Sequence, residues 1–162
     1  MCFDGWFCTT IKTGNPHPFK GAVSDQVGTN TDEETPKAPR LEAVVVASSG
    51  TIRHKVRAEL LGFNFQVTTV PDGIVAMSLI IRGKPEVVIV SGTVDSMPGF
   101  DLIRALVSMK VTNTTQVAAL TSFDLEHPEV LMLPEGIPVI QLKSDLQDQI
   151  SRALSAFEYR FL

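Results

Sequence analysis

Three polar residues that could do chemistry each stand at the end of an apolar, strand-like run. Ser91 follows EVVIV (86–90), Thr121 ends QVAALT (116–121), and Lys143 ends IPVIQLK (137–143). If these runs are parallel strands, their carboxyl ends meet at one edge of a sheet, where open α/β sheets bind ligands. A serine hydroxyl is a poor nucleophile without an adjacent base, and none is apparent near Ser91. Two hydroxyls, an ammonium group and a helix N-terminus could instead hold an anion such as phosphate.

Strand-like and helix-like segments alternate from Leu41 onward. The segment 50–61 places Ile52, Val56 and Leu60 on one helical stripe, and Gly62 is expected to end it. Asp72 could cap the following helix, and the hydroxyls of "SSGT" (48–51) could cap the first. The predicted strands are 42–48, 65–70, 86–90, 116–121 and 137–143, and the predicted helices are 50–61, 73–82, 99–110, a short one within 124–136, and 144–158.

Five strand–helix units in series imply parallel strands joined by right-handed crossovers. The sequence therefore predicts a doubly wound α/β domain over residues 41–162, with a five-stranded parallel sheet and helices on both faces. Residues 1–40 are rich in Pro, Gly, Thr, Asn and charge, and we interpret them as a disordered N-terminal arm. The tip of this arm (Phe3, Trp6, Phe7) is either a floppy terminus or a short docking motif.

Composition excludes several classes of protein. The net charge of −4 lacks the basic footprint of a nucleic-acid binder, and Arg53, Lys55 and Arg57 are expected to lie on a solvated helix face. No apolar stretch could span a bilayer and no secretory signal is present, so we expect a cytoplasmic protein without membrane insertion. Cys2 and Cys8 lack partners at metal-ligand spacing, and no nucleotide-binding glycine motif or nucleophile–base pair occurs. We expect no enzyme activity, no metal site and no cofactor.

The order of these features resembles the receiver domain of two-component, CheY-like response regulators over about residues 42–160. Met97 and Gly99 match the turn that opens the third helix of that family. Thr121 lies 30 residues after Ser91, and Lys143 lies 52 after it, where the family places a hydroxyl and a lysine. The resemblance implies a flavodoxin/CheY-like fold with strand order 2-1-3-4-5.

The resemblance fails at the residues that carry the family's chemistry. The phospho-accepting aspartate is replaced by Ser91, and the acidic pair after the first strand is replaced by Ala47 and Ser48. Mg²⁺ prefers oxygen ligands that include one or two carboxylates, whereas these positions together with Lys143 carry a formal +1. Asp95 is a conceivable displaced acceptor, but four extended residues would hold it up to about 13 Å away at the rim. The family's switching aromatic is replaced by Ile140.

We therefore expect a stand-alone pseudo-receiver that acts as a phosphorylation-independent interaction module in a signalling system. Its expected partner is another signalling protein, such as a kinase, regulator or localisation factor. The expected surface is formed by the fourth helix, fifth strand and fifth helix, with Leu131, Met132, Leu133 and Ile140, and it could also form a homodimer. The alternatives are a sensor that binds an anion or nucleotide at the carboxyl edge of the sheet, and an atypical phospho-receiver.

Overall fold

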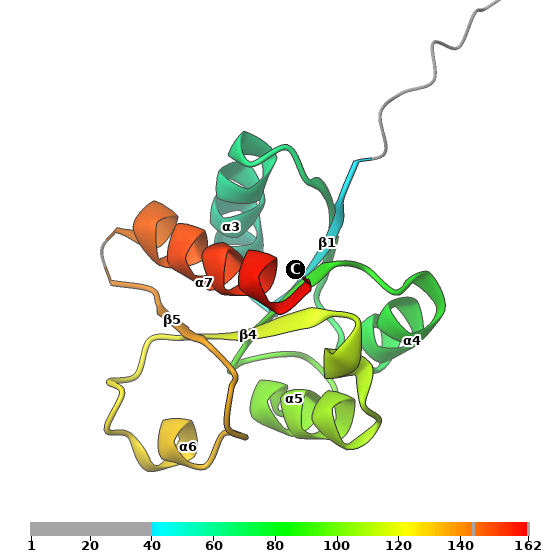
Figure 1. The fold of residues 1–162 in the computed structure, drawn as a ribbon. Helices are drawn as coiled ribbons and strands as arrows, with labels where there is room; N and C mark the ends of the chain where they lie inside the picture. The colour runs from blue at the N-terminus through cyan, green and yellow to red at the C-terminus, as the bar shows by residue number, and fades with distance from the viewer. Residues whose placement is uncertain (1–39, 144, 162) are drawn as a thin grey trace, which may run out of the picture. The chain divides into compact units, whose positions relative to one another are not determined.

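The computed structural model describes residues 40–143 and 145–161 (Figure 1). The predicted arm, with its aromatic tip, lies outside these residues except for Arg40.

Five strands alternate with helices along the described chain. The elements are β1 (Glu42–Val46), α3 (Gly50–Gly62), β2 (Gln66–Val70), α4 (Gly73–Gly83), β3 (Val87–Ser91), α5 (Gly99–Ser108), the short 3₁₀ helix η1 (Val111–Asn113), β4 (Gln116–Thr121), α6 (Pro128–Leu131), β5 (Val139–Gln141) and α7 (Leu146–Phe161). Of the helices described here, none has the length and apolar character that a bilayer span requires.

The strands form one parallel sheet in the order β2-β1-β3-β4-β5, which confirms the predicted fold class and strand order. The register pairs Val46 with Val90 and Ser91 with Leu120, so β1, β3 and β4 end at nearly the same level. All crossovers run from the end of one strand to the start of the next through a helix or short loop. The loops after the strands therefore collect at one edge of the sheet.

The three central strands bury alternate residues against opposite helical layers, as strand geometry requires. On one face Val44, Val46, Val88 and Val90 pack with residues of α4 and α5. On the other, their sequence neighbours pack with α3 and α7. Both faces are covered, which explains why these strands are continuous apolar runs rather than alternating ones.

Helix ends follow the predicted caps with one correction. Ser49 accepts a hydrogen bond from the Ile52 amide, and Asp72 accepts from the amides of Ile74 and Val75. Gly62, expected to end the first helix, is instead its last helical residue. The left-handed residue is Asn64, with φ 66°, and asparagine tolerates this conformation better than most residues.

The outer edge of β5 is closed by a side chain. The Gln141 amide donates to Gln149 Oε1 at 2.6 Å, and Gln149 Nε2 donates to the Gln141 carbonyl at 3.1 Å. The side-chain amide of α7 thus takes the place of a neighbouring strand. β5 covers only 139–141 of the predicted 137–143. Pro138 has no N–H with which to extend the ladder at the start of the strand, and beyond its end the Leu142 amide still donates to the Thr121 carbonyl at 2.8 Å.

Gly99 allows α5 to begin against the end of β3. A Cβ atom at this position would lie 1.7 Å from the Ser91 carbonyl oxygen, and the Gly99 amide donates to the Gly92 carbonyl at 3.1 Å. The loop 92–98 therefore begins and ends close to the carboxyl end of β3.

Replacing Gly99 with alanine is expected to destabilise the fold strongly, because the obstacle is backbone rather than a mobile side chain. We expect Gly99→Ala to lower the free energy of unfolding by at least about 2 kcal/mol. Gly62→Ala is the matched control, since a Cβ atom there meets nothing within 4 Å, and it should be neutral or stabilising by up to about 1 kcal/mol. Urea unfolding of the full chain measures both. Equal stability of the two variants would contradict the close approach.

Candidate functional site

The backbone brings the predicted site residues to the carboxyl edge of the sheet. Ala47 directly follows the Val46–Val90 pair and lies next to Ser91, and its amide donates to the Val70 carbonyl at 3.1 Å. Thr121 ends the adjacent strand β4, and Lys143 lies two residues beyond β5. Ala47, Ser91 and Thr121 are buried, and Lys143 is exposed.

Ser48 ties the end of β1 to the loop that follows β3. Its amide donates to the Thr93 carbonyl at 3.0 Å, and its hydroxyl donates to the same oxygen at 3.1 Å. A carbonyl oxygen has two lone pairs, so these two bonds fill its acceptor capacity. A cation that used the Thr93 carbonyl as a ligand would therefore have to displace the Ser48 hydroxyl.

Arg53 fills the space above the end of β1. Its guanidinium donates to the carbonyl of Ala47 at 2.5 Å and to that of Ser48 at 2.8 Å, and the residue is half-buried. This corrects the prediction that Arg53 lies on a solvated helix face. A long cation in the first turn of a helix that follows a strand can reach back to the orphan carbonyls of the strand end. That spacing was the signal in the sequence.

The two hydroxyls of the edge are engaged in local turns. Ser91 Oγ accepts from the Thr93 amide at 3.4 Å, and Thr121 Oγ1 accepts from the Phe123 amide at 3.0 Å. Their side chains are 4% and 3% exposed. Both hydroxyls thus stabilise the first turn after their strand.

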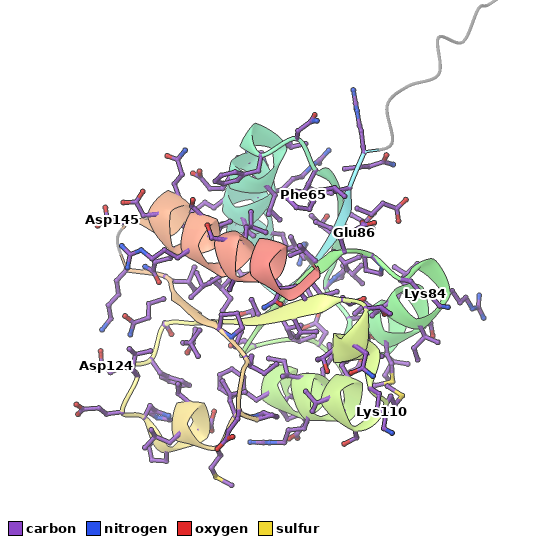
Figure 2. All side chains as sticks on the ribbon, in the orientation of Figure 1. Phe65, Lys84, Glu86, Lys110, Asp124 and Asp145 are labelled. Atoms are coloured by element: carbon purple, nitrogen blue, oxygen red, sulfur yellow. The ribbon has the colours of Figure 1, made fainter. Side chains whose placement is uncertain are left out.

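Lys143 forms an ion pair with Asp124 on the loop between β4 and α6. Asp124 projects from this loop in Figure 2, and both side chains are more than half exposed. The hydrogen bond from Lys143 holds the pKa of the Asp124 carboxyl below its ordinary value. The positive charge expected from Lys143 at the edge is therefore balanced by Asp124, and Arg53 supplies the cation that lies there.

A pocket of about 390 Å³ lies beside Lys143, between α3 and the start of α7. Its charged lining combines Lys55 and Lys143 with Glu59 and Asp145. The signs balance, so the lining gives no clear preference for an anion. The anion-sensor alternative stays a prediction without a supporting observation.

Asp95 lies on the far side of the edge from Lys143, as expected for a rim residue. Its amide donates to the Pro71 carbonyl and its carbonyl accepts from the Gly73 amide, both at 3.0 Å. The neighbouring Asp72 accepts a hydrogen bond from the Ser96 hydroxyl, and this bond, with those from the amides of α4, lowers the pKa of Asp72. These backbone contacts place Asp95 beside the start of α4.

The residues predicted to form an interaction surface divide into two groups. Leu131 and Met132 are both 69% exposed, whereas Leu133 packs partly against the core. Ile140 is 1% exposed and belongs to the core between β4, β5 and α7. The prediction is wrong for Ile140, because alternation along β5 turns its side chain inward.

The chemistry open to this edge follows from its groups. The positions 47, 48 and 91 bring no carboxylate, the Thr93 carbonyl is saturated, and a guanidinium covers the end of β1. Within 40–143 and 145–161, no group of three His, Cys, Asp or Glu side chains gathers as metal ligands would. A hard divalent cation requires several oxygen ligands, and this donor set does not fit one.

Solved structures of receiver domains share this fold. The signal receiver domain of a LuxO repressor protein of Vibrio parahaemolyticus aligns with a TM-score of 0.65 at 14% identity, over 76% of this chain and 94% of that one. The chemotaxis response regulator CheY4 of Vibrio cholerae gives a TM-score of 0.62 at 19% identity, over 73% and 99%. The BeF3-activated receiver domain of RstA from Klebsiella pneumoniae gives 0.63 at 22%, over 72% and 97%.

No family model and no curated protein matches the sequence. The chain has the fold of a response-regulator receiver domain, which confirms the predicted resemblance at the level of structure.

The ion pair of Lys143 can be measured through Asp124. In Lys143→Gln the pKa of Asp124 should rise toward its ordinary value, because the hydrogen bond and the nearby positive charge are both lost. Carboxyl-carbon NMR titration of the full chain measures the shift. The pKa of Asp72, which depends on Ser96, should stay unchanged and serves as the control.

An Asp124 pKa that is the same with and without the Lys143 ammonium group would show that the two side chains do not pair. The direction of the Asp124 pKa shift also determines how the ion pair changes the stability of the fold with pH. A lowered native pKa means that the pair stabilises the fold above the ordinary carboxyl pKa, and that this contribution disappears as the pH falls through the native pKa.

Proposed function

We propose that the protein is a phosphorylation-independent regulatory module that acts by binding another signalling protein. The observation that carries this proposal is the closed carboxyl edge, where Ser48 saturates the Thr93 carbonyl and Arg53 covers the end of β1. The fold is shared with receiver domains, whose edge is the place of phosphoryl chemistry in that family. Here the same edge is filled by the chain's own side chains.

Phosphoryl transfer depends on neutralising charge that develops on the phosphoryl oxygens and on holding the reactants in line. Ser91 is 4% exposed, and the described contacts of its hydroxyl include no carboxylate or imidazole that could remove its proton. A divalent ion would also have to approach the guanidinium of Arg53. Both the nucleophile and the metal that the reaction needs are disfavoured, and we propose no turnover of any substrate at this edge.

A switch also requires an element with two arrangements. Thr121 is held by its turn with Phe123, and Ile140 is locked in the core. An aliphatic side chain packed at 1% exposure has no solvent-facing alternative of similar energy, since exposing it costs about 1.5–3 kcal/mol. We infer that the domain presents one fixed surface instead of exchanging two.

The surface best suited to a partner lies around α6. Four apolar side chains between β4 and the residue that follows α6 are exposed: Phe123 (39%), Leu125 (54%), Leu131 (69%) and Met132 (69%). The same segment carries four exposed acidic side chains, of which Asp124 pairs with Lys143: Asp124, Glu126, Glu129 and Glu135. Large exposed apolar side chains that occur together with charged ones on one segment are candidates for a protein-binding site. The charge favours a partner segment that is both apolar and basic.

We expect magnesium and a phosphoryl donor to leave the protein unchanged. The melting temperature of the full chain in MgCl₂ should equal that in NaCl of the same ionic strength, because a ligand raises it only by binding the native state. Intact mass after incubation with acetyl phosphate and Mg²⁺ should show no phosphoryl adduct. A receiver with a complete carboxylate set, treated in parallel, should show one. An adduct on this protein would refute phosphorylation independence.

The α6 surface can be tested by truncation. In Leu131→Ala/Met132→Ala, capture of a partner from cell extract should fall by about tenfold or more, since such residues dominate small interfaces. The melting temperature should change little, because both side chains are mostly exposed. Leu61→Ala is the matched control: Leu61 is 51% exposed on α3, in the opposite helical layer. Unchanged capture by the double variant would show that the partner binds elsewhere.

A further inference from the structure

The outer face of α4 is apolar and exposed. Ile74 is 61% exposed, Val75 52%, Leu79 41% and Ile81 45%, while Ala76 and Ile80 on the inner face are fully buried. A helix that is apolar all round normally has both sides covered. The described part of the chain covers only the inner side of α4, through β1, β2 and α5.

The exposed face is built around a small residue at its centre. Ser78 is exposed and lies in the middle of the helix, with Ile74 one turn before it and Arg82 one turn after it on the same line. Val75 and Leu79 border this line on one side, and Ile81 on the other. A small side chain at the crossing point lets a second helix approach within the 8–10 Å typical of packed pairs.

Charge is distributed along α4 with opposite signs at its two ends. Asp72 caps the first turn, and a backbone bridge joins it to Asp95, which is exposed, so two acidic residues lie at the start of the helix. The last turn carries Arg82, followed by Lys84, whose position at the end of α4 is labelled in Figure 2. No other charged side chain lies between positions 72 and 84. If a second copy of α4 is turned by 180° about an axis at Ser78, its basic end meets the acidic end of the first copy, and the reverse holds at the other end.

We propose that two copies of this chain pair through α4, with the helices antiparallel and Ser78 at the two-fold axis. Each Ile74 then faces Arg82 of the other copy. The aliphatic stem of Arg82 covers the isoleucine, and its guanidinium reaches the carboxylates at the start of the helix. Isologous two-fold contacts of this kind are the commonest in soluble oligomers.

The size of the face sets the strength of the pair. α4 has 11 residues and is about 16 Å long, so the buried area falls below that of a standard interface. Such contacts are weak, and we expect a dissociation constant on the order of 10–100 µM. The pairing through α4 does not involve Leu131 or Met132. A result that contradicts the dimer would therefore leave the proposed partner surface around α6 unaffected, and the reverse also holds.

A lysine at the crossing point tests the geometry. Sedimentation of the full chain from low to high micromolar concentration should show a reversible dimer, and Ser78→Lys should raise the dissociation constant by about tenfold or more. Ser155→Lys places the same change on an exposed position of α7 and should leave the dimer intact. Circular dichroism and the melting temperature establish that both variants fold. A protein that stays monomeric throughout, or a dimer unaffected by Ser78→Lys, overturns the proposal.

A charge exchange tests the antiparallel arrangement itself. Asp95→Arg and Arg82→Asp should each weaken the dimer, because like charges then meet across the axis. The double variant Asp95→Arg/Arg82→Asp should restore it toward the wild-type value. Absence of that rescue overturns the antiparallel pairing, and so does a dimer that is lost in Leu131→Ala/Met132→Ala but not in the α4 variants.

Discussion

The structure of the carboxyl edge depends on how the carbonyl groups that follow β1 find hydrogen-bond partners. Parallel strands leave unpaired carbonyls where they end, and such groups are costly to bury unsatisfied. Here Arg53 donates to the carbonyls of Ala47 and Ser48, while Ser48 donates twice to that of Thr93. In a carboxylate-lined edge of this fold, a metal ion and its waters can meet part of this need. In this chain the partners are covalently part of the protein and are present in every state of it.

This permanence has a consequence for regulation. A ligand shifts a conformational equilibrium only by its difference in affinity for the two conformations. An edge whose carbonyls already accept from Ser48 and Arg53 offers a small ligand fewer unsatisfied groups, and Ile140 is buried and not free to change between two exposed positions. Under the proposed function, control of this domain would act through the amount of protein, its partners or its assembly, and not through chemical modification of the edge.

The sequence was sufficient for the fold because both layers of helices cover the sheet. Continuous runs such as 86–90 and the stripe of Val56 and Leu60 follow directly from that double burial. It was also sufficient to find Ser91 and Thr121 at the strand ends. It missed the role of Arg53. The position of Arg53 in the first turn after β1 brings its side chain within reach of the strand end, but a charge pattern along a helix does not show which way a long side chain bends. It placed Ile140 on the surface, because that position was assigned by its match to the family's switching aromatic and not by the alternation along β5, which turns the side chain inward. The partner of Lys143, Asp124, lies on an irregular loop that no periodicity describes.

The apolar face of α4 and the apolar surface around α6 lie at opposite edges of the sheet. Because they are separate, both can be occupied at the same time. α4 packs against β1 and β2 at one edge, whereas α6 precedes β5 at the other (Figure 1). A pair joined through α4 would therefore hold its two α6 surfaces apart and open. Two weak sites held on one assembly bind a multivalent partner more tightly than either does alone, by effective concentration and without any new contact. Because the α4 pair is weak, this gain would appear only when the local concentration of the protein is high. Under the proposed function, binding of the partner would then depend on protein concentration through assembly, and not on chemistry at the carboxyl edge.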